Sequence, residues 1–588
     1  MEKMGFPEMF RRWVSMLHHG ATTRLVLPTG LSEIIKVMFS FRQGDPIAMN
    51  LYILQQEPFL RLLRRTLTGL TITNIKQIDK SYCDDVETLS SDIRDLVKFD
   101  NVMKKFESTS GAILSRKIKS KVMGVGQWQG KEDWPVKYLK VVSEMKIFGF
   151  TICPTYQETV KKTWDRVLRG FEQVLFSWQS RQLETLAQRV EVAKTFALSK
   201  LYYVAQVLPL PNKYRKQVES SLSRFIFRGR HERLQLDELQ NSYEQGGLGL
   251  PNIAVKADSL LLKQMCRMMN LPDEESFHLM GYWLGGFLRD TGLGENFPEL
   301  ADLGPVSHTL SGTFPLHKYM LDTFLEGVGR GEVKRNNEPV ANTALHDEVL
   351  RVGQHAAQLA GRGDQQQNAA QGDVPAQNSQ DDMPATQGRK SILKTVMTKG
   401  IYTSRMTDLL VPPKAEAKFP QVNFRELVYP RLQSKVLEVK QRDLLFSLTH
   451  GIYRNRERLF QQNRVDNNLC PYPSCKRENL VEDVEHLFCL CYKVRAAWQW
   501  TRGKMLEMMR DQGRPPDVQN MDIILSMFPK CRQEAGVMLI LGTYVELVDR
   551  EAVMKQKELL VNTVIGVLKN KTEYAQKRAV PQVLLPLP

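Results

Sequence analysis

Two groups of side chains in this sequence have residue types and spacings that suit metal binding. The first is a pair of adjacent acids, Asp84 and Asp85, which directly follows Tyr82-Cys83. Two neighbouring carboxylates repel each other unless water or a cation shares their charge, so the pair is a candidate site for a hard divalent cation. Acid pairs are also common in solvated turns, and the pair taken alone fits either interpretation.

The second group consists of cysteines and a histidine between residues 470 and 491. Four residues separate Cys470 from Cys475, and four residues also separate His486 from Cys491, with Cys489 as a competing fourth ligand. Thiolates and a neutral imidazole suit Zn²⁺ in a closed tetrahedral site, which contributes folding free energy to a segment too small for its own core. A site with four protein ligands favours a folding or nucleic-acid-binding module over a hydrolytic zinc, and four unrelated side chains are the alternative.

Short runs of β-branched or apolar residues flank the acid pair, at residues 72–78 and 86–89, and predict a strand, a tight turn and a second strand. Residues 96–106 and 164–178 are amphipathic with helical spacing. Residues 186–201 predict a core helix with one buried stripe, made up of Leu186, Val190, Ala193, Ala197 and Leu201. This mixture of elements favours the α+β class.

The composition indicates a multidomain protein with polyanionic partners. The chain has 588 residues, of which 42% are hydrophobic, so two to four domains are expected. With 81 Lys and Arg against 65 Asp and Glu, the formal charge of +16 suits a polyanionic partner such as nucleic acid, and a basic but otherwise ordinary surface is the alternative. Residues 361–387 are rich in Gln, Asn, Asp and Gly and predict a linker.

The sequence predicts an intracellular protein, in the nucleus and/or the cytoplasm, with no membrane role. Residues 1–20 contain no apolar region of the kind that a secretory signal has. The longest apolar stretch, residues 536–548, is too short to cross a bilayer and contains Glu546, so a buried helix is expected there.

Further motifs surround the acid pair in a fixed order. Upstream is FRQGDP at residues 41–46, and downstream are SGAIL at 110–114, KS at 119–120 and KIFGF at 146–150. This set resembles the reverse transcriptases of non-LTR (LINE-type) retrotransposons, in which an RQGDP segment, a YxDD turn, an SGxxLNxxKS segment and a glycine-centred hairpin follow one another at similar spacing. The resemblance is strong over residues 36–255, where EQGGLGLP at 244–251 matches a segment that follows the palm, and looser over residues 436–500.

The resemblance implies a role for each matching residue. Asp84 matches the catalytic, Mg²⁺-binding aspartate of the YxDD turn, and Asp85 matches its less directly engaged neighbour. Residues that match template-, primer- or nucleotide-binding positions are Arg42, Gln43, Gly44, Lys119, Lys146 and Gly149. The implied function is RNA-directed DNA synthesis with Mg²⁺, in which element RNA, target DNA and deoxynucleoside triphosphates are the partners.

The family also has an essential aspartate on an earlier strand, which precedes the helix matched by residues 1–17. That strand and the fingers have no counterpart in these 588 residues. We therefore expect a reverse transcriptase domain protein that is catalytically incomplete, with little or no activity from the chain alone. The alternative is a non-catalytic remnant that binds RNA or DNA.

The resemblance also covers the cysteine cluster, because similar elements end in a zinc-binding segment with an EHL-type histidine and a final cysteine followed by a tryptophan. It favours Cys470, Cys475, His486 and Cys491 as ligands of a structural Zn²⁺, with Trp498 as the tryptophan. The expected domains are a partial palm with an antiparallel sheet and helices (1–155), a helical thumb (156–270), a helical connection region (271–350), a disordered Gln-rich linker (351–392) and a mainly helical C-terminal region (393–588) with the zinc-binding segment at 468–500.

Overall fold

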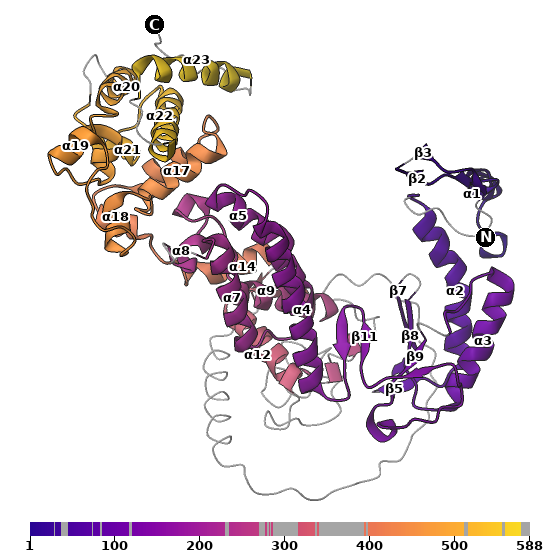
Figure 1. Cartoon of the computed structure of the whole chain (residues 1–588). Helices are drawn as coiled ribbons and strands as arrows, with labels where there is room; N and C mark the ends of the chain where they lie inside the picture. The colour runs from indigo at the N-terminus through magenta and orange to yellow at the C-terminus, as the bar shows by residue number, and fades with distance from the viewer. Residues whose placement is uncertain are drawn as a thin grey trace, which may run out of the picture. The chain divides into compact units, whose positions relative to one another are not determined.

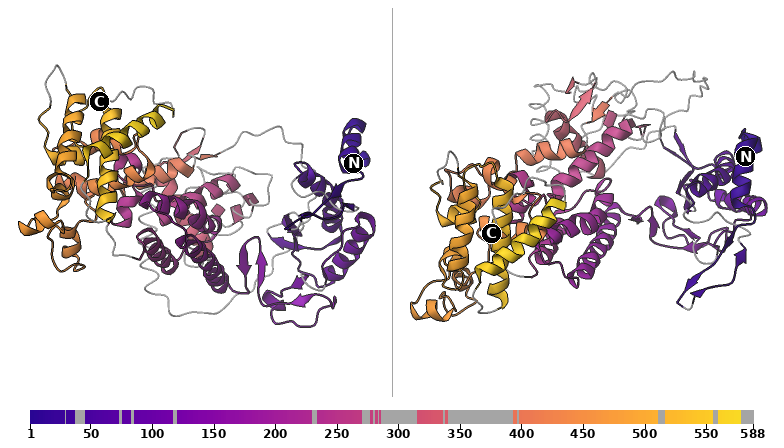
Figure 2. Two further views of the ribbon diagram at one scale, coloured as in Figure 1. Left: turned by 45° about the horizontal axis from the view of Figure 1, so that its top comes forward. Right: turned by 90° about the horizontal axis from the view of Figure 1, so that it is seen from above.

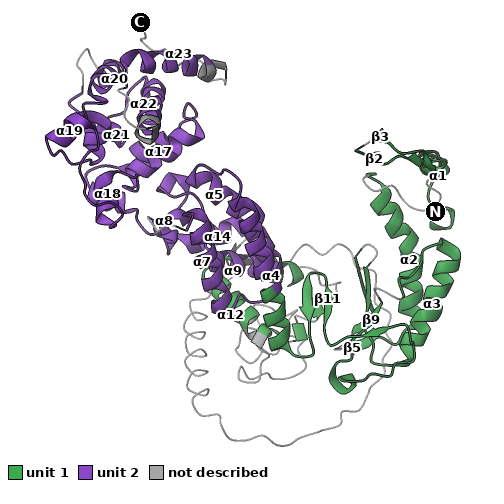
Figure 3. Cartoon of the chain, in the orientation of Figure 1, with its two compact units in different colours: residues 1–165, 265–395 green, residues 166–264, 396–588 purple. Residues whose placement is uncertain are grey.

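The computed structural model describes residues 1–28, 30–36, 45–72, 75–82, 85–116, 120–229, 234–269, 277–278, 281–282, 284–285, 315–335, 338–339, 393–395, 398–510, 516–554 and 559–577. The chain divides into two compact units, with residues 1–165 and 265–395 in unit 1 and residues 166–264 and 396–588 in unit 2 (Figures 1 and 3). The predicted linker and most of the predicted connection region lie outside the described residues. Helices and small, mainly antiparallel sheets are compatible with the predicted α+β class.

Unit 1 combines helices with short strand pairs. Its helical elements are η1 (Glu2–Met4), α1 (Glu8–His18), α2 (Ala48–Thr66), α3 (Arg94–Ser110), η2 (Gly126–Trp128), α12 (Pro315–Gly329) and the start of α4 (Tyr156–Gln179). Its strands are β1 (Thr22–Thr23), β2 (Val26–Leu27), β3 (Gly30–Leu31), β4 (Ile35–Lys36), β5 (Leu70–Ile72), β6 (Ile75–Gln77), β7 (Asp79–Tyr82), β8 (Asp85–Thr88), β9 (Lys121–Val122), β10 (Lys140–Val141), β11 (Met145–Ile147), β12 (Phe150–Ile152), β13 (Val333–Arg335), β14 (Glu338–Pro339) and β15 (Leu393–Thr395). The pairs β1–β4, β2–β3, β5–β6, β7–β8 and β11–β12 are antiparallel, β9–β10 is parallel, and β13 lies between β14 and β15.

The predicted hairpin around the acid pair is confirmed, with a shifted first strand. Strands β7 and β8 pair with Tyr82 opposite Asp85. The first strand begins at Asp79, later than predicted, because residues 70–72 pair with residues 75–77 as β5 and β6. Arg64 of α2 donates two hydrogen bonds of 2.8 and 3.0 Å to the buried carboxylate of Asp79, so the hairpin is attached to α2 at its base.

A small apolar core lies between α2, α3 and this hairpin. Phe59 and Leu63 of α2 pack with Val102 of α3 and with Ile78, which directly precedes β7. The ring of Phe59 lies 4.8 Å from that of Phe106, measured between centroids. Burial of these side chains supplies the hydrophobic stabilisation that holds the hairpin against the two helices.

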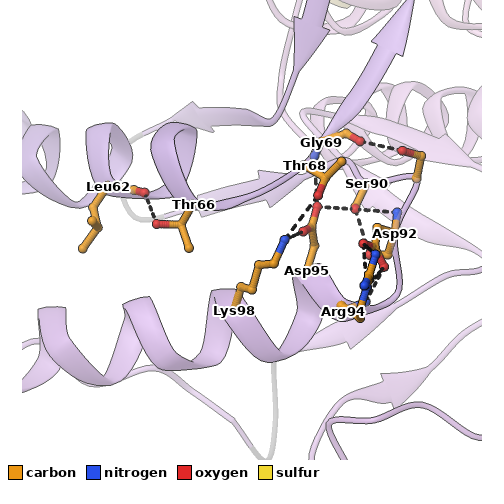
Figure 4. Close-up of polar contacts among 10 residues, drawn as sticks. Leu62, Thr66, Thr68, Gly69, Ser90, Asp92, Arg94, Asp95 and Lys98 are labelled. Carbon is orange, nitrogen blue, oxygen red and sulfur yellow. Dashed lines mark hydrogen bonds and ion pairs between the residues drawn. The ribbon is translucent and has the colours of Figure 1, made fainter.

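The carboxylate of Asp95 joins the start of α3 to the loops around it (Figure 4). Its oxygens accept hydrogen bonds from Gly69 N at 2.9 Å, from Ser90 Oγ at 2.6 Å and from Lys98 Nζ at 2.9 Å. Burial alone raises the pKa of this carboxyl, but the hydrogen bonds outweigh burial and lower the pKa well below its ordinary value. The ionised form therefore stabilises the folded state.

Unit 2 is built from helices. Its N-terminal segment contains the remainder of α4, α5 (Leu186–Val192), a π-helical stretch η3 (Ala193–Leu198), α6 (Ser199–Ala205), α7 (Asn212–Ile226), α8 (Leu236–Gln240), η4 (Tyr243–Gln245) and most of α9 (Ile253–Met269). Its C-terminal segment contains α14 (Thr398–Thr407), α15 (Lys414–Lys418), α16 (Phe424–Leu432), α17 (Val439–Thr449), α18 (Arg456–Gln461), α19 (Pro473–Arg477), a π-helical stretch η7 (His486–Leu490), α20 (Arg495–Met508), α21 (Asn520–Ile524), α22 (Glu534–Met554) and α23 (Val561–Lys577).

The buried helices that the sequence predicts in unit 2 are confirmed. The predicted stripe at residues 186–201 is fully buried and is formed by α5, η3 and α6. The apolar stretch at 536–548 lies in α22, which contacts α17, α20 and α23, and Figure 2 shows this bundle (orange to yellow) from two further directions. Among the described residues, no helix combines the length and apolar character that crossing a bilayer requires.

A side chain from beyond residue 396 caps a helix in the N-terminal segment of unit 2. The carboxylate of Asp443 accepts hydrogen bonds from Leu186 N at 2.7 Å and Ala187 N at 3.4 Å, so it caps the start of α5. These N–H groups have no acceptor inside the helix, and a carboxylate also complements the helix dipole.

Two of the three glycines in the EQGGLGLP segment, Gly246 and Gly247, have no room for a side chain. Gly246 has a φ of +77°, and a Cβ added there would lie 2.3 Å from an atom of the buried Tyr429 ring. A Cβ on Gly247 would lie 2.0 Å from the backbone oxygen of Asn241. The segment needs glycine at both positions because a side chain would displace α16 or the neighbouring backbone.

We expect Asp95→Asn to lower the free energy of unfolding by about 2 kcal/mol at pH 7, because it removes a charged acceptor from three donors. The pKa of Asp95 is lower in the folded state than in the unfolded state, so its contribution is complete above about pH 4 and is lost as the pH falls through the folded-state value. Denaturant unfolding at several pH values should show the wild-type advantage narrowing below about pH 4. An advantage independent of pH, or an equal effect from the exposed control Asp133→Asn, would contradict this role.

We also expect Gly246→Ala to destabilise unit 2 by about 3 kcal/mol or more, because backbone strain adds to the clash with Tyr429. Gly249→Ala is a matched control, since Gly249 has a φ of +62° but a Cβ there would meet only Lys194 Nζ at 3.9 Å. The control should cost about 1 kcal/mol from backbone strain alone. If denaturant unfolding shows equal losses of unfolding free energy for Gly246→Ala and Gly249→Ala, Tyr429 does not constrain the segment.

Candidate metal centre

The first two cysteines of the cluster lie on a short closed loop. Leu469 and Val481 form an isolated antiparallel bridge, and Cys470 N donates a 2.8 Å hydrogen bond to Leu480 O. Between them, α19 begins with Pro473 and contains Cys475, whose carbonyl accepts a 3.1 Å hydrogen bond from Leu480 N. These contacts place Cys470 and Cys475 on the same side of the loop.

The other two ligands lie at the two ends of a π-helical turn. Asp483 Oδ1 accepts a 2.6 Å hydrogen bond from His486 N and fixes the beginning of η7. At its end, Cys491 N donates a 2.7 Å hydrogen bond to His486 O. This bond spans five residues and makes the turn wider than an α-helical one. The wide turn places Cys491 near His486 in space, and α20 begins shortly after it.

The structure brings Cys470, Cys475, His486 and Cys491 into one buried cluster, in which the ligand atoms all lie within 4.8 Å of one another. The sulfur of Cys491 is 3.8 Å from that of Cys470 and 3.6 Å from that of Cys475. A tetrahedral zinc with Zn–S bonds of about 2.3 Å would have sulfurs about 3.8 Å apart. The predicted set is therefore brought together, and it could bind zinc.

The chemistry of the donors supports a cation at this position. His486 Nε2 is buried and has no hydrogen-bond partner among the described residues. A hydrogen bond from the Cys491 thiol lowers the pKa of Cys470 to about 4, and the same contact together with burial raises the pKa of Cys491. Three thiolates at these distances repel one another unless a cation lies between them. Cys489 is also buried but does not belong to the cluster, so Cys491 completes it.

The cluster is attached to the helical core through the turn that carries His486. Tyr544 of α22 donates a 2.5 Å hydrogen bond to Phe488 O, and the ring of Tyr453 packs edge-on against Phe488 at 5.2 Å. Trp498 of α20, the tryptophan expected after the last cysteine, lies 5.2 Å from the ring of Tyr544. A metal in the cluster would therefore stabilise α20 and α22 as well as its own loop.

Glu482 is a neighbour of the cluster that the sequence analysis did not single out. Burial raises its pKa to about 7, and its carboxylate accepts a 3.0 Å hydrogen bond from Arg456 N at the start of α18. The group of acids directly before His486, in the run EDVEH, is the local signal that could have identified it.

The predicted catalytic hairpin is described only in part. Asp84 lies outside the described residues, and Asp85 is exposed at the first position of β8. The half-buried carboxyl of Glu87 has a raised pKa because of burial and because of the negative charge of Asp85. Negative charge therefore accumulates beside the turn, an arrangement that suits a divalent cation.

A second hairpin contacts the first one within unit 1. Strands β11 and β12 pair antiparallel on either side of Phe148 and Gly149, both of which have positive φ. The ring of Phe148 lies 6.5 Å from that of Tyr82 in an edge-to-face arrangement, so the two predicted motifs lie side by side. Lys146 is exposed on β11. The remaining predicted binding residues, Arg42, Gln43, Gly44 and Lys119, lie outside the described residues.

Comparison with known proteins finds a distant, partial relative. No family model matches the chain. Over 275 residues the chain is 22% identical to the transposon TX1 uncharacterized 149 kDa protein of Xenopus laevis, and the match covers 46% of this chain. It covers 21% of the relative, so the chain spans about a fifth of the length of that protein. The chain is thus distantly related to a transposon protein.

We expect the purified protein to contain one zinc ion per chain and Cys491→Ala to contain none, because three ligands no longer close the tetrahedron. Cys489→Ala is the matched control and should keep its zinc, although it loses some stability from the cavity that it creates. Elemental analysis and thermal unfolding with and without a chelator would measure both effects. Zinc loss in the Cys489 variant but not in the Cys491 variant would exchange the two assignments.

Proposed function

We propose that the chain is part of the reverse transcriptase of a non-LTR retrotransposon and contributes the palm, the thumb and a C-terminal zinc-binding segment. The contact between Tyr82 and Phe148 carries this assignment, because it joins the YxDD-like hairpin to the glycine-centred hairpin, two motifs that are separate in the sequence. In a polymerase of this class the two hairpins would hold the metal ions and the primer end. The distant relationship to a transposon protein supports the same origin.

In this proposal Asp84 and Asp85 hold Mg²⁺, which would activate the primer 3′-hydroxyl and neutralise the departing pyrophosphate. The carboxylates beside the turn, where burial and the charge of Asp85 together raise the pKa of Glu87, fit this role. Lys146 and Gly149 bind the primer end, Lys119 contacts the nucleotide phosphates, and Arg42, Gln43 and Gly44 line the template and incoming nucleotide. The substrates are element RNA as template, target DNA as primer, and deoxynucleoside triphosphates.

A second candidate function is binding of RNA or DNA without chemistry. It is favoured by the Cys3His cluster, which is buried and uses four protein ligands. In such a site the protein fills all four coordination positions, so no substrate can bind to the metal. The metal then stabilises the local fold, which can present a binding surface. The net charge of +16 suits a polyanionic partner under either function.

Primer extension on an RNA template with Mg²⁺ distinguishes the two functions. We expect little extension by the chain alone, and extension when the upstream fingers and the earlier aspartate strand of a related element are fused before residue 1. Asp84→Ala in the fused protein should reduce extension by about a thousandfold or more, because a metal ligand is lost. The exposed control Asp133→Asn should leave the rate unchanged.

Extension by the unfused chain that Asp84→Ala abolishes would show that another carboxylate of this chain completes the metal site. Failure of the fused protein to extend, combined with salt-dependent RNA binding, would favour the binding function. Extension that survives Asp84→Ala would contradict the assignment of the catalytic aspartate.

A further inference from the structure

A cavity in unit 2 lies beside the EQGGLGLP segment, and none of the proposed catalytic or metal-binding residues is part of its lining. Its volume is about 200 Å³, and its lining includes Gln240, Gln245, Pro251, Lys256, Tyr402 and Met406. The first four come from α8, the glycine segment and α9, and the last two come from α14. The cavity therefore depends on the packing of two segments that are distant in the sequence.

Lys256 is a half-buried cation without a carboxylate partner among the described residues. Its Nζ lies 5.5 Å from the centroid of the Tyr402 ring. Burial lowers the pKa of Lys256, and the positive charge of Lys263 lowers it further. A cation in this position loses hydration, and an aromatic face alone compensates for only part of that loss. An anion in the cavity would supply the rest.

The other polar groups of the cavity also have unused donors. Gln245 Oε1 accepts a hydrogen bond from Ser242 N, and Gln240 Oε1 accepts one from Asn252 Nδ2. The amide nitrogens of both glutamines then have no acceptor within the described part of the chain. Tyr402 Oη accepts a 2.9 Å hydrogen bond from Asn252 N, so its own hydrogen is available to donate. A ligand that satisfies these groups must be rich in acceptors.

Apolar side chains form the remaining wall of the cavity. They are Pro251, Met406 and Leu410, and none of the described residues that line the cavity is acidic. A ligand that fits must therefore combine an anionic, acceptor-rich group with a compact apolar part. Inorganic phosphate has no apolar part. A single nucleotide combines a phosphate with a flat base.

We propose that this cavity binds one nucleotide of a nucleic-acid strand, with its phosphate on Lys256 and the two glutamine amides and its base against Pro251, Met406 and Leu410. Binding at this site requires no polymerase chemistry, so this proposal is independent of the proposed metal-binding hairpin. It would hold a strand at a fixed point next to the glycine segment. Lys256 is the residue on which affinity depends most, because it supplies the only charge in the lining described here.

Calorimetric titration of the full chain with adenosine 5′-monophosphate, adenosine and inorganic phosphate tests this site. The monophosphate should bind at least about tenfold more tightly than either adenosine or phosphate, because only it has both parts. Lys256→Met should weaken its binding about tenfold or more. Lys263→Met is the matched control, since it removes the same charge from an exposed position on the same helix, and it should change affinity less than about twofold.

Leu410→Trp is a second variant, which fills the apolar wall and should also abolish binding while Lys256 is unchanged. Thermal unfolding shows that each variant is folded. Asp84→Ala should bind the nucleotide normally, so loss of polymerase activity and loss of this site are separate results. Equal effects of Lys256→Met and Lys263→Met, equal affinity for phosphate alone, or unchanged binding in Leu410→Trp would each overturn the nucleotide site.

Discussion

The first backbone N–H groups of α5 are satisfied by the carboxylate of Asp443, and this contact joins the two sequence segments that make up unit 2. Burial raises the pKa of Asp443, whereas the hydrogen bonds from Leu186 and Ala187 lower it, so the helix start and the acid compensate for each other's loss of water. The same pairing of distant segments recurs where Tyr429 covers Gly246 and where Tyr402 accepts a hydrogen bond from Asn252 N. The contact between Tyr402 and Asn252 N holds α14 beside the glycine segment, where the two segments line the cavity.

The cysteine cluster and the apolar core of unit 2 are linked in a similar way. The turn that carries His486 and Cys491 also presents Phe488, whose carbonyl is bound by Tyr544 and whose ring packs against Tyr453. This small loop has few apolar residues of its own. It is stabilised by the metal ligands and by its contacts with α22. Because Tyr544 reaches the turn between the two ligands, movement of α22 would change the geometry of the cluster directly.

Local sequence patterns predict much of this structure. They do not predict the contacts between residues that are distant in the sequence. The buried stripe at residues 186–201 and the buried helix at 536–548 follow from spacing and composition. Spacing also identified the cysteine cluster but left Cys489 and Cys491 open, because the choice depends on a π-helical turn that has no sequence signature. The first strand of the acid hairpin begins later than its apolar content predicts, since that content at 72–78 does not reveal that residues 70–72 pair with residues 75–77. Asp443 contacts Leu186, and Gly246 contacts Tyr429. No local sequence pattern indicates that either pair of residues would meet in the folded chain.

The hydrogen bond between Asp443 and Leu186 spans 257 residues, and this separation affects how the chain matures. At synthesis rates of about 5 to 20 residues per second, the cap of α5 follows the helix out of the ribosome by on the order of 10 to 50 s. During that interval the first N–H groups of α5 lack the carboxylate that later caps them. Contacts of such high sequence separation also form slowly after synthesis, because the loop-closure entropy must be lost first. Unit 2 is therefore completed only after the residues around Asp443 have been synthesised.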